Sequence, residues 1–164
     1  MKKILFGLFG IIFTSAFLNC EKDDICEQGT PTTPRLIVEF YDNNSPTNKK
    51  NITDLKVIAE GQTNALNFTS TNKIELPLKV NDNLVNYTFT INSKSTTLNL
   101  EDKITMNYKR NDLFISRACG YISVFELNAV DGITLSSPKK WIQEIVILNH
   151  SITNEKETHV KIFF

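Results

Sequence analysis

The alternation of apolar and polar side chains is the feature that most constrains the fold of this chain. Every second residue is apolar in residues 85–92, and the same alternation recurs in residues 103–109. A period of two places successive side chains on opposite faces of a β-strand, whereas a helix needs a period near 3.6. Further strand-like segments are residues 35–41, 55–60, 73–80, 96–100, 122–127, 141–148 and 159–164. We therefore predict an all-β domain.

Short polar turns separate these segments. Residues 81–83, 110–112 and 131–132 are rich in Asn, Asp and Gly, which favour turns. Strands that are joined by short connections pair as antiparallel neighbours. For residues 35–164 we therefore predict an antiparallel two-sheet β-sandwich of eight or nine strands, Ig-like or prealbumin-like, with a small β-barrel as the alternative.

The composition is that of a single folded domain. Hydrophobic residues make up 41% of the chain, which argues against intrinsic disorder. The 18 basic and 18 acidic residues are spread evenly, so there is no basic patch of the kind that binds nucleic acid. We therefore expect no nucleic-acid partner and one domain with a single core.

The N-terminus has the form of a secretory signal peptide. Two lysines, Lys2 and Lys3, precede a largely apolar segment at residues 4–18. A membrane-spanning helix needs roughly 20 apolar residues, so this segment is too short to be a permanent anchor helix. We therefore predict that residues 1–19 are a signal peptide and that the protein is exported.

The end of that segment carries the predicted membrane anchor. Residues 17–20, Phe-Leu-Asn-Cys, resemble the lipobox of bacterial lipoproteins, with Asn19 in place of the usual small residue. The resemblance implies cleavage before Cys20 and lipid on its thiol, which would hold the protein in the outer membrane, with residues 20–34 as a tether. Residues 22–24, Lys-Asp-Asp, are similar to the signal that sends many Bacteroidota lipoproteins to the cell surface; the alternative is a plain solvated tether.

The cysteine count predicts one disulfide. If lipid occupies Cys20, then Cys26 and Cys119 remain as a pair in an oxidising compartment. A bridge that closes so long a loop would add about 4–5 kcal/mol in the chain-entropy model. We predict that this bridge clamps the tether to the sandwich; the alternative is two free buried thiols. Because Gly120 follows Cys119, we also expect a bulge or a close backbone approach there.

The polar residues offer few candidates for chemistry. His150 and His159 flank the last turn, and Glu155 or Glu157 would be needed as a further metal ligand. Exposed turn residues are the commoner explanation of such a pattern. No serine lies in a Gly-x-Ser-x-Gly setting. We therefore predict no catalytic residue, no metal site and no cofactor.

The aromatic residues admit two interpretations. Trp141, Tyr41, Tyr87, Tyr108 and Tyr121 could form a surface on which sugar rings stack. Except for Tyr41, however, they occupy inward-facing or ambiguous positions of the predicted strands. We therefore expect them in the core.

Four short motifs are spread over the mature chain. They are Asp-Ile-Cys at 24–26, Thr-Pro-Thr-Thr-Pro-Arg at 30–35, Phe-Tyr-Asp at 40–42 and Arg-Ala-Cys-Gly-Tyr at 117–121. Together they resemble a family of small uncharacterised Bacteroidota lipoproteins, a domain of unknown function. The resemblance implies no activity. It suggests that Arg35 and Arg117 act as structural partners beside the cysteines, where the tether meets the domain.

Two functions remain to be distinguished. The first is a non-enzymatic lipoprotein of the envelope that serves as a structural module or binds a partner protein or glycan. The second is an envelope hydrolase with an unrecognised site. A deep polar cleft that contains two titratable groups with shifted pKa values would indicate the hydrolase. A smooth sandwich with one exposed apolar patch would indicate the binding module, which we expect.

Overall fold

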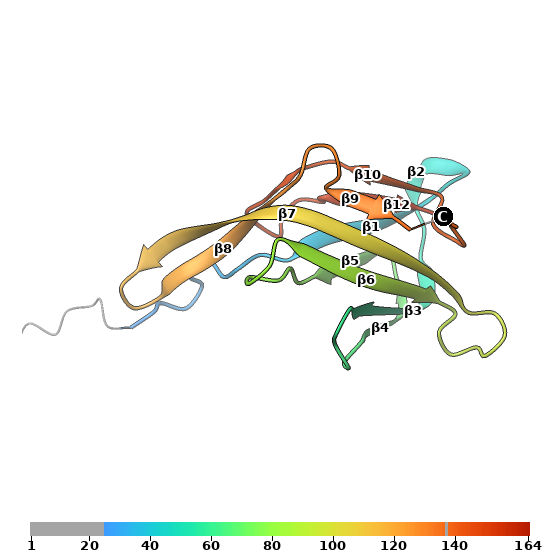
Figure 1. Ribbon diagram of the computed structural model, residues 1–164, viewed down its shortest axis with the longest axis horizontal. Helices are drawn as coiled ribbons and strands as arrows, with labels where there is room; N and C mark the ends of the chain where they lie inside the picture. Colours follow the sequence, from blue (N-terminus) through green and yellow to red (C-terminus); the bar gives the residue numbers. More distant parts are fainter. Residues whose placement is uncertain (1–24, 137) are drawn as a thin grey trace, which may run out of the picture. The chain divides into compact units, whose positions relative to one another are not determined.

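The structure, a computed structural model, describes residues 25–136 and 138–164 (Figure 1). Contacts group the described residues into a smaller compact unit, residues 25–31 and 114–121, and a larger unit, residues 32–113 and 122–164. The described residues form strands and no helix, and hence no helix that could cross a membrane. The strands are β1 Leu36–Asp42, β2 Ser45–Lys49, β3 Ile52–Ala59, β4 Leu66–Thr71, β5 Lys73–Leu76, β6 Leu84–Ile91, β7 Leu100–Ser116, β8 Gly120–Leu127, β9 Ile133–Leu135, β10 Glu144–Ile147, β11 Ser151–Ile152 and β12 Val160–Phe163.

One sheet has five strands and is built around β1. Its order is β10-β12-β1-β2, and β5 also pairs with β1. The β1–β12 pair is parallel, with Val38 level with Val160, whereas the other strand pairs of this sheet are antiparallel, as predicted. These two strands come from opposite ends of the domain, and no short connection forces them to run antiparallel. All but the last residue of β1 are buried, as expected for a strand covered on both faces.

The other sheet has seven strands, of which β6, β7 and β8 follow one another as a meander. Its order is β11-β8-β7-β6-β3-β4, and β9 pairs with β7. The strand at 73–80 was predicted to be a further neighbour, but β5 pairs with β1 in the first sheet. The β6–β7 pairing runs without a break from Leu84 opposite Asn107 to Ile91 opposite Leu100. The alternation in residues 85–92 and 103–109 therefore predicts both strands correctly. Their direct pairing was not predicted, because a separate strand was expected between them at residues 96–100.

Several predicted boundaries are wrong. The predicted turn at residues 110–112 lies inside β7, which continues for 17 residues because β8 pairs with it. Residues 96–99 form part of the turn between β6 and β7 and not a strand. The segment between the predicted strands 35–41 and 55–60 contains the edge strand β2, which was not predicted. The short strands β4, β9 and β11 were also not predicted, and the structure has twelve strands where eight or nine were expected.

The inner faces of the two sheets share one hydrophobic core. Phe40 of β1, Phe89 of β6 and Tyr108 of β7 are at most 2% exposed and belong to the same cluster. Neither sheet closes on itself, so the larger unit is a β-sandwich and the barrel alternative is wrong. Burial of these aromatic side chains supplies much of the energy that holds the sheets together. The larger unit is called the sandwich below.

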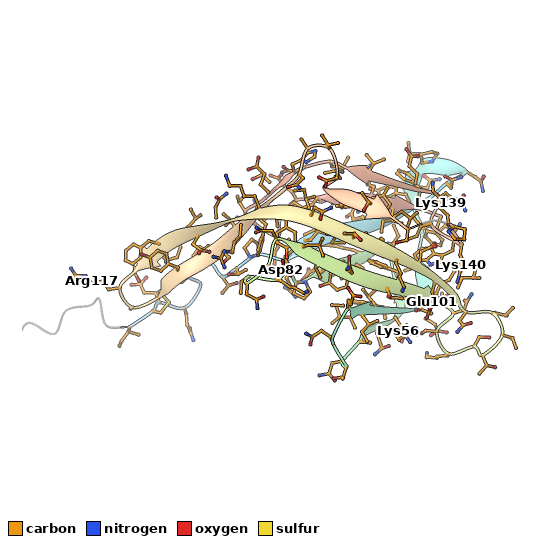
Figure 2. All side chains as sticks on the ribbon, viewed as in Figure 1. Lys56, Asp82, Glu101, Arg117, Lys139 and Lys140 are labelled. Atoms are coloured by element: carbon orange, nitrogen blue, oxygen red, sulfur yellow. A yellow bond between two sulfur atoms is a disulfide. The ribbon has the colours of Figure 1, made fainter. Side chains whose placement is uncertain are left out.

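A buried carboxylate links the two sheets. Asp102, 2% exposed on the inner face of β7, accepts hydrogen bonds from the backbone N–H groups that precede β10. Its Oδ1 lies 2.8 Å from the Lys140 nitrogen, and its Oδ2 lies 2.9 Å and 2.8 Å from the nitrogens of Trp141 and Ile142. Figure 2 labels Lys140 and also Glu101, the residue before Asp102. Because β7 and β10 belong to different sheets, this carboxylate joins them.

Candidate functional site

The hollows on the surface of the described residues are small. Four of them have volumes of about 210, 250, 240 and 320 Å³. Pockets that hold small molecules usually measure roughly 300–1,000 Å³. The hollow of 320 Å³ lies at the turn of residues 80–83, beside Arg110. None of the four is a deep cleft of the kind expected for a hydrolase.

One hollow lies over the outer face of β3 and β6. Its lining includes Glu60, Asn86, Thr88 and Lys103, and its volume is about 250 Å³. The Asn86 amide donates to the Glu60 carboxylate over 2.6 Å and accepts from the Thr105 hydroxyl over 2.8 Å. The result is a shallow surface of hydrogen-bonding side chains, without an exposed aromatic ring among them.

An ion pair joins the buried Glu39 of β1 to the exposed Lys49 of β2. Glu39, 7% exposed, accepts from the Lys49 ammonium over 2.6 Å and from the Tyr41 hydroxyl over 3.0 Å. Burial alone would raise the pKa of Glu39, but the hydrogen bonds from Lys49 and Tyr41 outweigh it and lower that pKa. The pKa of Lys49 is raised in turn by its bond to Glu39. Both groups therefore stay charged near neutral pH, which suits a structural pair and not a proton-transfer pair.

Arg35 forms a second ion pair within the sandwich. Its guanidinium Nε and Nη2 donate to the Glu155 carboxylate over 2.8 Å and 3.0 Å, and its backbone N–H donates to the same carboxylate over 2.9 Å. These bonds lower the pKa of Glu155 to about 2. A further contact of 2.6 Å joins Arg35 to Glu75. The acidic partners of Arg35 are therefore in the sandwich, whereas the expected role beside a cysteine is not observed.

The two histidines are engaged separately. His159 is fully buried, and its Nδ1 accepts from the backbone N–H of Ile37 over 2.9 Å. Its Nε2 therefore carries the proton and has no hydrogen-bond partner among the described residues, while burial lowers the pKa of the ring. His150 contacts the Leu127 carbonyl over 3.1 Å, and Glu157 accepts from an asparagine amide. The described residues contain no group of three or more metal-binding side chains.

Cys26 and Cys119 form a disulfide in the smaller unit. Their Cα atoms are 4.9 Å apart, and the bridge joins residues 25–31 to the turn between β7 and β8. Neither cysteine belongs to the hydrophobic core. The prediction that the bridge joins the tether to the sandwich is therefore corrected: the bridge joins residues 25–31 to the end of the β7–β8 hairpin, within the smaller unit. The hydroxyl of Thr30 lies 3.7 Å from the Cys119 sulfur and donates to the Glu27 carbonyl over 2.7 Å.

Gly120 is required for its backbone conformation. Its φ is +71°, in the left-handed region that residues with a Cβ rarely adopt. A Cβ added there would meet nothing within 4 Å, so the expected close backbone approach is not observed. The glycine allows the chain to turn tightly into β8 just after the bridged cysteine.

The hairpin end exposes a pair of aromatic rings. Phe114 and Tyr121 are 58% and 69% exposed, and their ring centroids are 5.3 Å apart in an edge-to-face arrangement. Ile25, beside the bridge, is 78% exposed. Ile25, Phe114 and Tyr121 are called the aromatic tip below. Figure 2 labels Arg117 at the turn of the same hairpin, where it is exposed.

The tyrosines and the tryptophan follow the predicted pattern with two exceptions. Tyr87, Tyr108 and Trp141 are at most 5% exposed, as expected. Tyr41, which was not assigned to an inward position, is also buried, at 7% exposed. Tyr121, which was expected in the core, is exposed on the aromatic tip. Alternation along the strand predicts on which face of the sheet the Tyr121 side chain lies. It does not reveal whether another segment covers that face.

Other predictions concern residues that the structure does not describe. The signal peptide at 1–19, lipidation of Cys20 and the export signal at 22–24 all lie outside the described residues. They therefore remain predictions.

Comparison with known proteins gives a family but no activity. No curated protein and no solved structure is similar enough to match the chain. Residues 54–164 match the model of a family of unknown function, DUF6452. This match covers most of the sandwich and the whole of the β7–β8 hairpin, including Cys119. Because it spans more than half of the sequence, the chain belongs to the DUF6452 family.

Proposed function

We propose that this protein is an exported, non-enzymatic lipoprotein of the outer membrane, anchored through lipid on Cys20. Its sandwich serves as a binding or structural module of the envelope. The aromatic tip is the surface through which the module makes contact close to its anchor. The proposal includes display on the cell surface, directed by residues 22–24.

The aromatic tip is the observation that carries this proposal. Phe114 and Tyr121 expose most of their rings, whereas large aromatic side chains are usually buried in a folded domain. An exposed apolar patch of this kind marks a surface that contacts another molecule or a membrane. The disulfide joins the patch to the segment that leads back to Cys20. The predicted anchor, Cys20, therefore precedes by six residues the cysteine that is bridged to the hairpin carrying this contact surface.

The alternative, an envelope hydrolase, has little support in the described residues. The two ion pairs with shifted pKa values, Glu39–Lys49 and Arg35–Glu155, do not line the four hollows. In both pairs the pKa of the acid is lowered, so neither acid would carry a proton for catalysis near pH 7.

A partner protein or glycan would suit the outer face of β3 and β6. Asn86, Glu60 and Lys103 offer hydrogen-bond donors and acceptors around one shallow hollow. Shallow polar surfaces of this type fit hydroxyl-rich ligands, which bind through several hydrogen bonds.

Lipidation is tested by replacing the predicted anchor. The Cys20→Ser variant is expected to leave the membrane fraction or to accumulate uncleaved, while wild-type protein carries acyl chains detectable by intact mass. A matched control, Cys26→Ser, removes a different cysteine and should still be acylated and membrane-bound. Normal maturation and membrane association of Cys20→Ser would refute the anchor.

Surface display and binding need separate tests. Replacing residues 22–24 with alanine should preserve acylation but remove accessibility to protease added to intact cells.

A photo-crosslinking residue at Thr88 should capture an envelope protein or glycan, whereas the same residue at the exposed Thr134 of β9 should not. Equal labelling at both positions would argue against binding at the hollow over β3 and β6.

A further inference from the structure

We propose that the aromatic tip rests in the interface of the lipid bilayer and that the Cys26–Cys119 bridge holds it there. This inference rests on the proposed function, because it assumes the lipid on Cys20. It specifies which component of the envelope the tip contacts: the bilayer surface itself.

The length of the tether limits how far the tip can lie from the membrane. Cys26 follows Cys20 by six residues, and a fully extended chain spans at most about 3.6 Å per residue, or roughly 20 Å here. This limit holds for any path of the residues between the two cysteines. The bridge places the Cα of Cys119 only 4.9 Å from that of Cys26. The turn of the β7–β8 hairpin is therefore held close to the acylated cysteine.

The side chains at the tip suit a membrane interface. Tyr121 combines an apolar ring with a hydroxyl, and such side chains concentrate at the level of the lipid headgroups. Phe114, packed against it, and Ile25 add exposed apolar surface. Exposure of these apolar side chains to water is unfavourable in free energy, whereas their burial at the boundary between headgroups and acyl chains is favourable.

The charges of the smaller unit neither drive nor oppose this contact. Arg117 is the one charged residue in 114–121, and Glu27 is the one charged residue in 25–31. The net charge of these described segments is therefore zero. Contact should depend on apolar surface and on the tether, and vesicles of zwitterionic lipid should be sufficient to show it.

The test uses full-length acylated protein in phosphatidylcholine vesicles that contain lipid brominated near the headgroup. Bromine quenches tryptophan fluorescence at short range. Tyr121→Trp reports on the tip, and Thr69→Trp, at an exposed position of β4, is the matched reporter on the sandwich. Trp141 is the one native tryptophan and is buried, so its emission is measured in unsubstituted protein and subtracted.

Tyr121→Trp is expected to lose about half or more of its added emission, because an interfacial ring lies within ~10 Å of the headgroup boundary. Thr69→Trp is expected to lose almost none. Replacing both bridged cysteines with serine in the Tyr121→Trp protein should bring its quenching down towards that of Thr69→Trp. Unchanged quenching would overturn the role given to the bridge.

The outcomes separate this inference from the proposed function. Intact mass first establishes whether Cys20 carries acyl chains, and their absence refutes the proposed function. Acylated protein in which Tyr121→Trp is not quenched overturns the bilayer contact alone. Capture of an envelope protein by a photo-crosslinker at position 121, without quenching, would also overturn it and would identify the tip as a protein-docking site.

Discussion

The buried carboxylate of Asp102 is expected to be worth several kcal/mol of stability. It accepts hydrogen bonds from the backbone N–H groups of Lys140, Trp141 and Ile142, with nitrogen–oxygen distances of 2.8–2.9 Å. Trp141 is 5% exposed and Ile142 is fully buried, so water cannot readily replace the carboxylate as their acceptor. Hydrogen bonds to a charged group contribute about 1.5–3 kcal/mol each, and neutral ones about 0.5–1.5 kcal/mol.

These values set the expected effect of two substitutions. Asp102→Asn keeps one acceptor oxygen for Trp141 and Ile142, but turns an amide N–H₂ towards the N–H of Lys140. Weakening two bonds and losing a third should cost about 4 kcal/mol in the free energy of unfolding. Asp102→Ala removes all three acceptor contacts and should cost about 5 kcal/mol. In a chain of this size each kcal/mol lowers Tm by roughly 2–4 °C, so Asp102→Asn should melt about 10 °C lower.

Urea and thermal unfolding, followed by circular dichroism, measure the global effect. The fluorescence of Trp141 gives a local readout, because its indole is buried and its Nε1–H lies 3.3 Å from the Phe89 carbonyl. A red shift in folded Asp102→Asn would show that the segment before β10 has loosened. The matched control is Glu101→Gln, which removes one exposed carboxylate charge from the preceding residue and should change stability by less than about 0.5 kcal/mol. If Asp102→Asn were as stable as this control, the role given to the carboxylate would be wrong.

Three further predictions follow from the bridge, the buried histidine and the core tyrosines. Replacing Cys26 and Cys119 by serine should lower the free energy of unfolding by about 4–5 kcal/mol and retain the β-sheet spectrum, since neither cysteine is in the core; an unchanged Tm would contradict this. Because burial lowers the pKa of His159, the unfolded chain binds its proton more readily, so stability should fall as pH drops below about 6.5. Urea unfolding should show a smaller loss in His159→Asn, whose amide oxygen can replace Nδ1 as acceptor; equal losses would refute the assignment. Burial raises the pKa of Tyr87 and of Tyr108 to about 12, so an absorbance titration should show a late tyrosinate step near pH 12 that disappears when both are replaced by Phe.

The sequence by itself determined the class of fold and the two strands of the central hairpin. Alternation in residues 85–92 and 103–109 assigns Tyr87 and Tyr108 to the inner face, where the structure has them. The count of cysteines, once one is assigned to lipid, leaves the single pair that is bridged. These features depend only on the local period of apolar residues and on the number of cysteines, and both can be read directly from the sequence.

Other features were decided only by contacts between distant segments. Residues 110–112 have turn-forming side chains, yet β7 continues through them as a strand that pairs with β8. The parallel β1–β12 pair joins the two ends of the domain, and no local pattern encodes that direction. In each case the stabilising hydrogen bonds come from another strand, and their energy outweighs the local preference of the chain.

The candidate site shows the same division. Tyr121 and Tyr108 are both strand residues, but Tyr108 is covered by the core whereas Tyr121 is exposed beside Phe114. Asp102 is charged, yet it occupies an inward position because three backbone N–H groups meet it there. Strand alternation determines the face on which a side chain lies. Whether that face is buried, and whether a buried charge finds its partners, depends on which distant segment packs against it, and this is decided only when the tertiary structure forms.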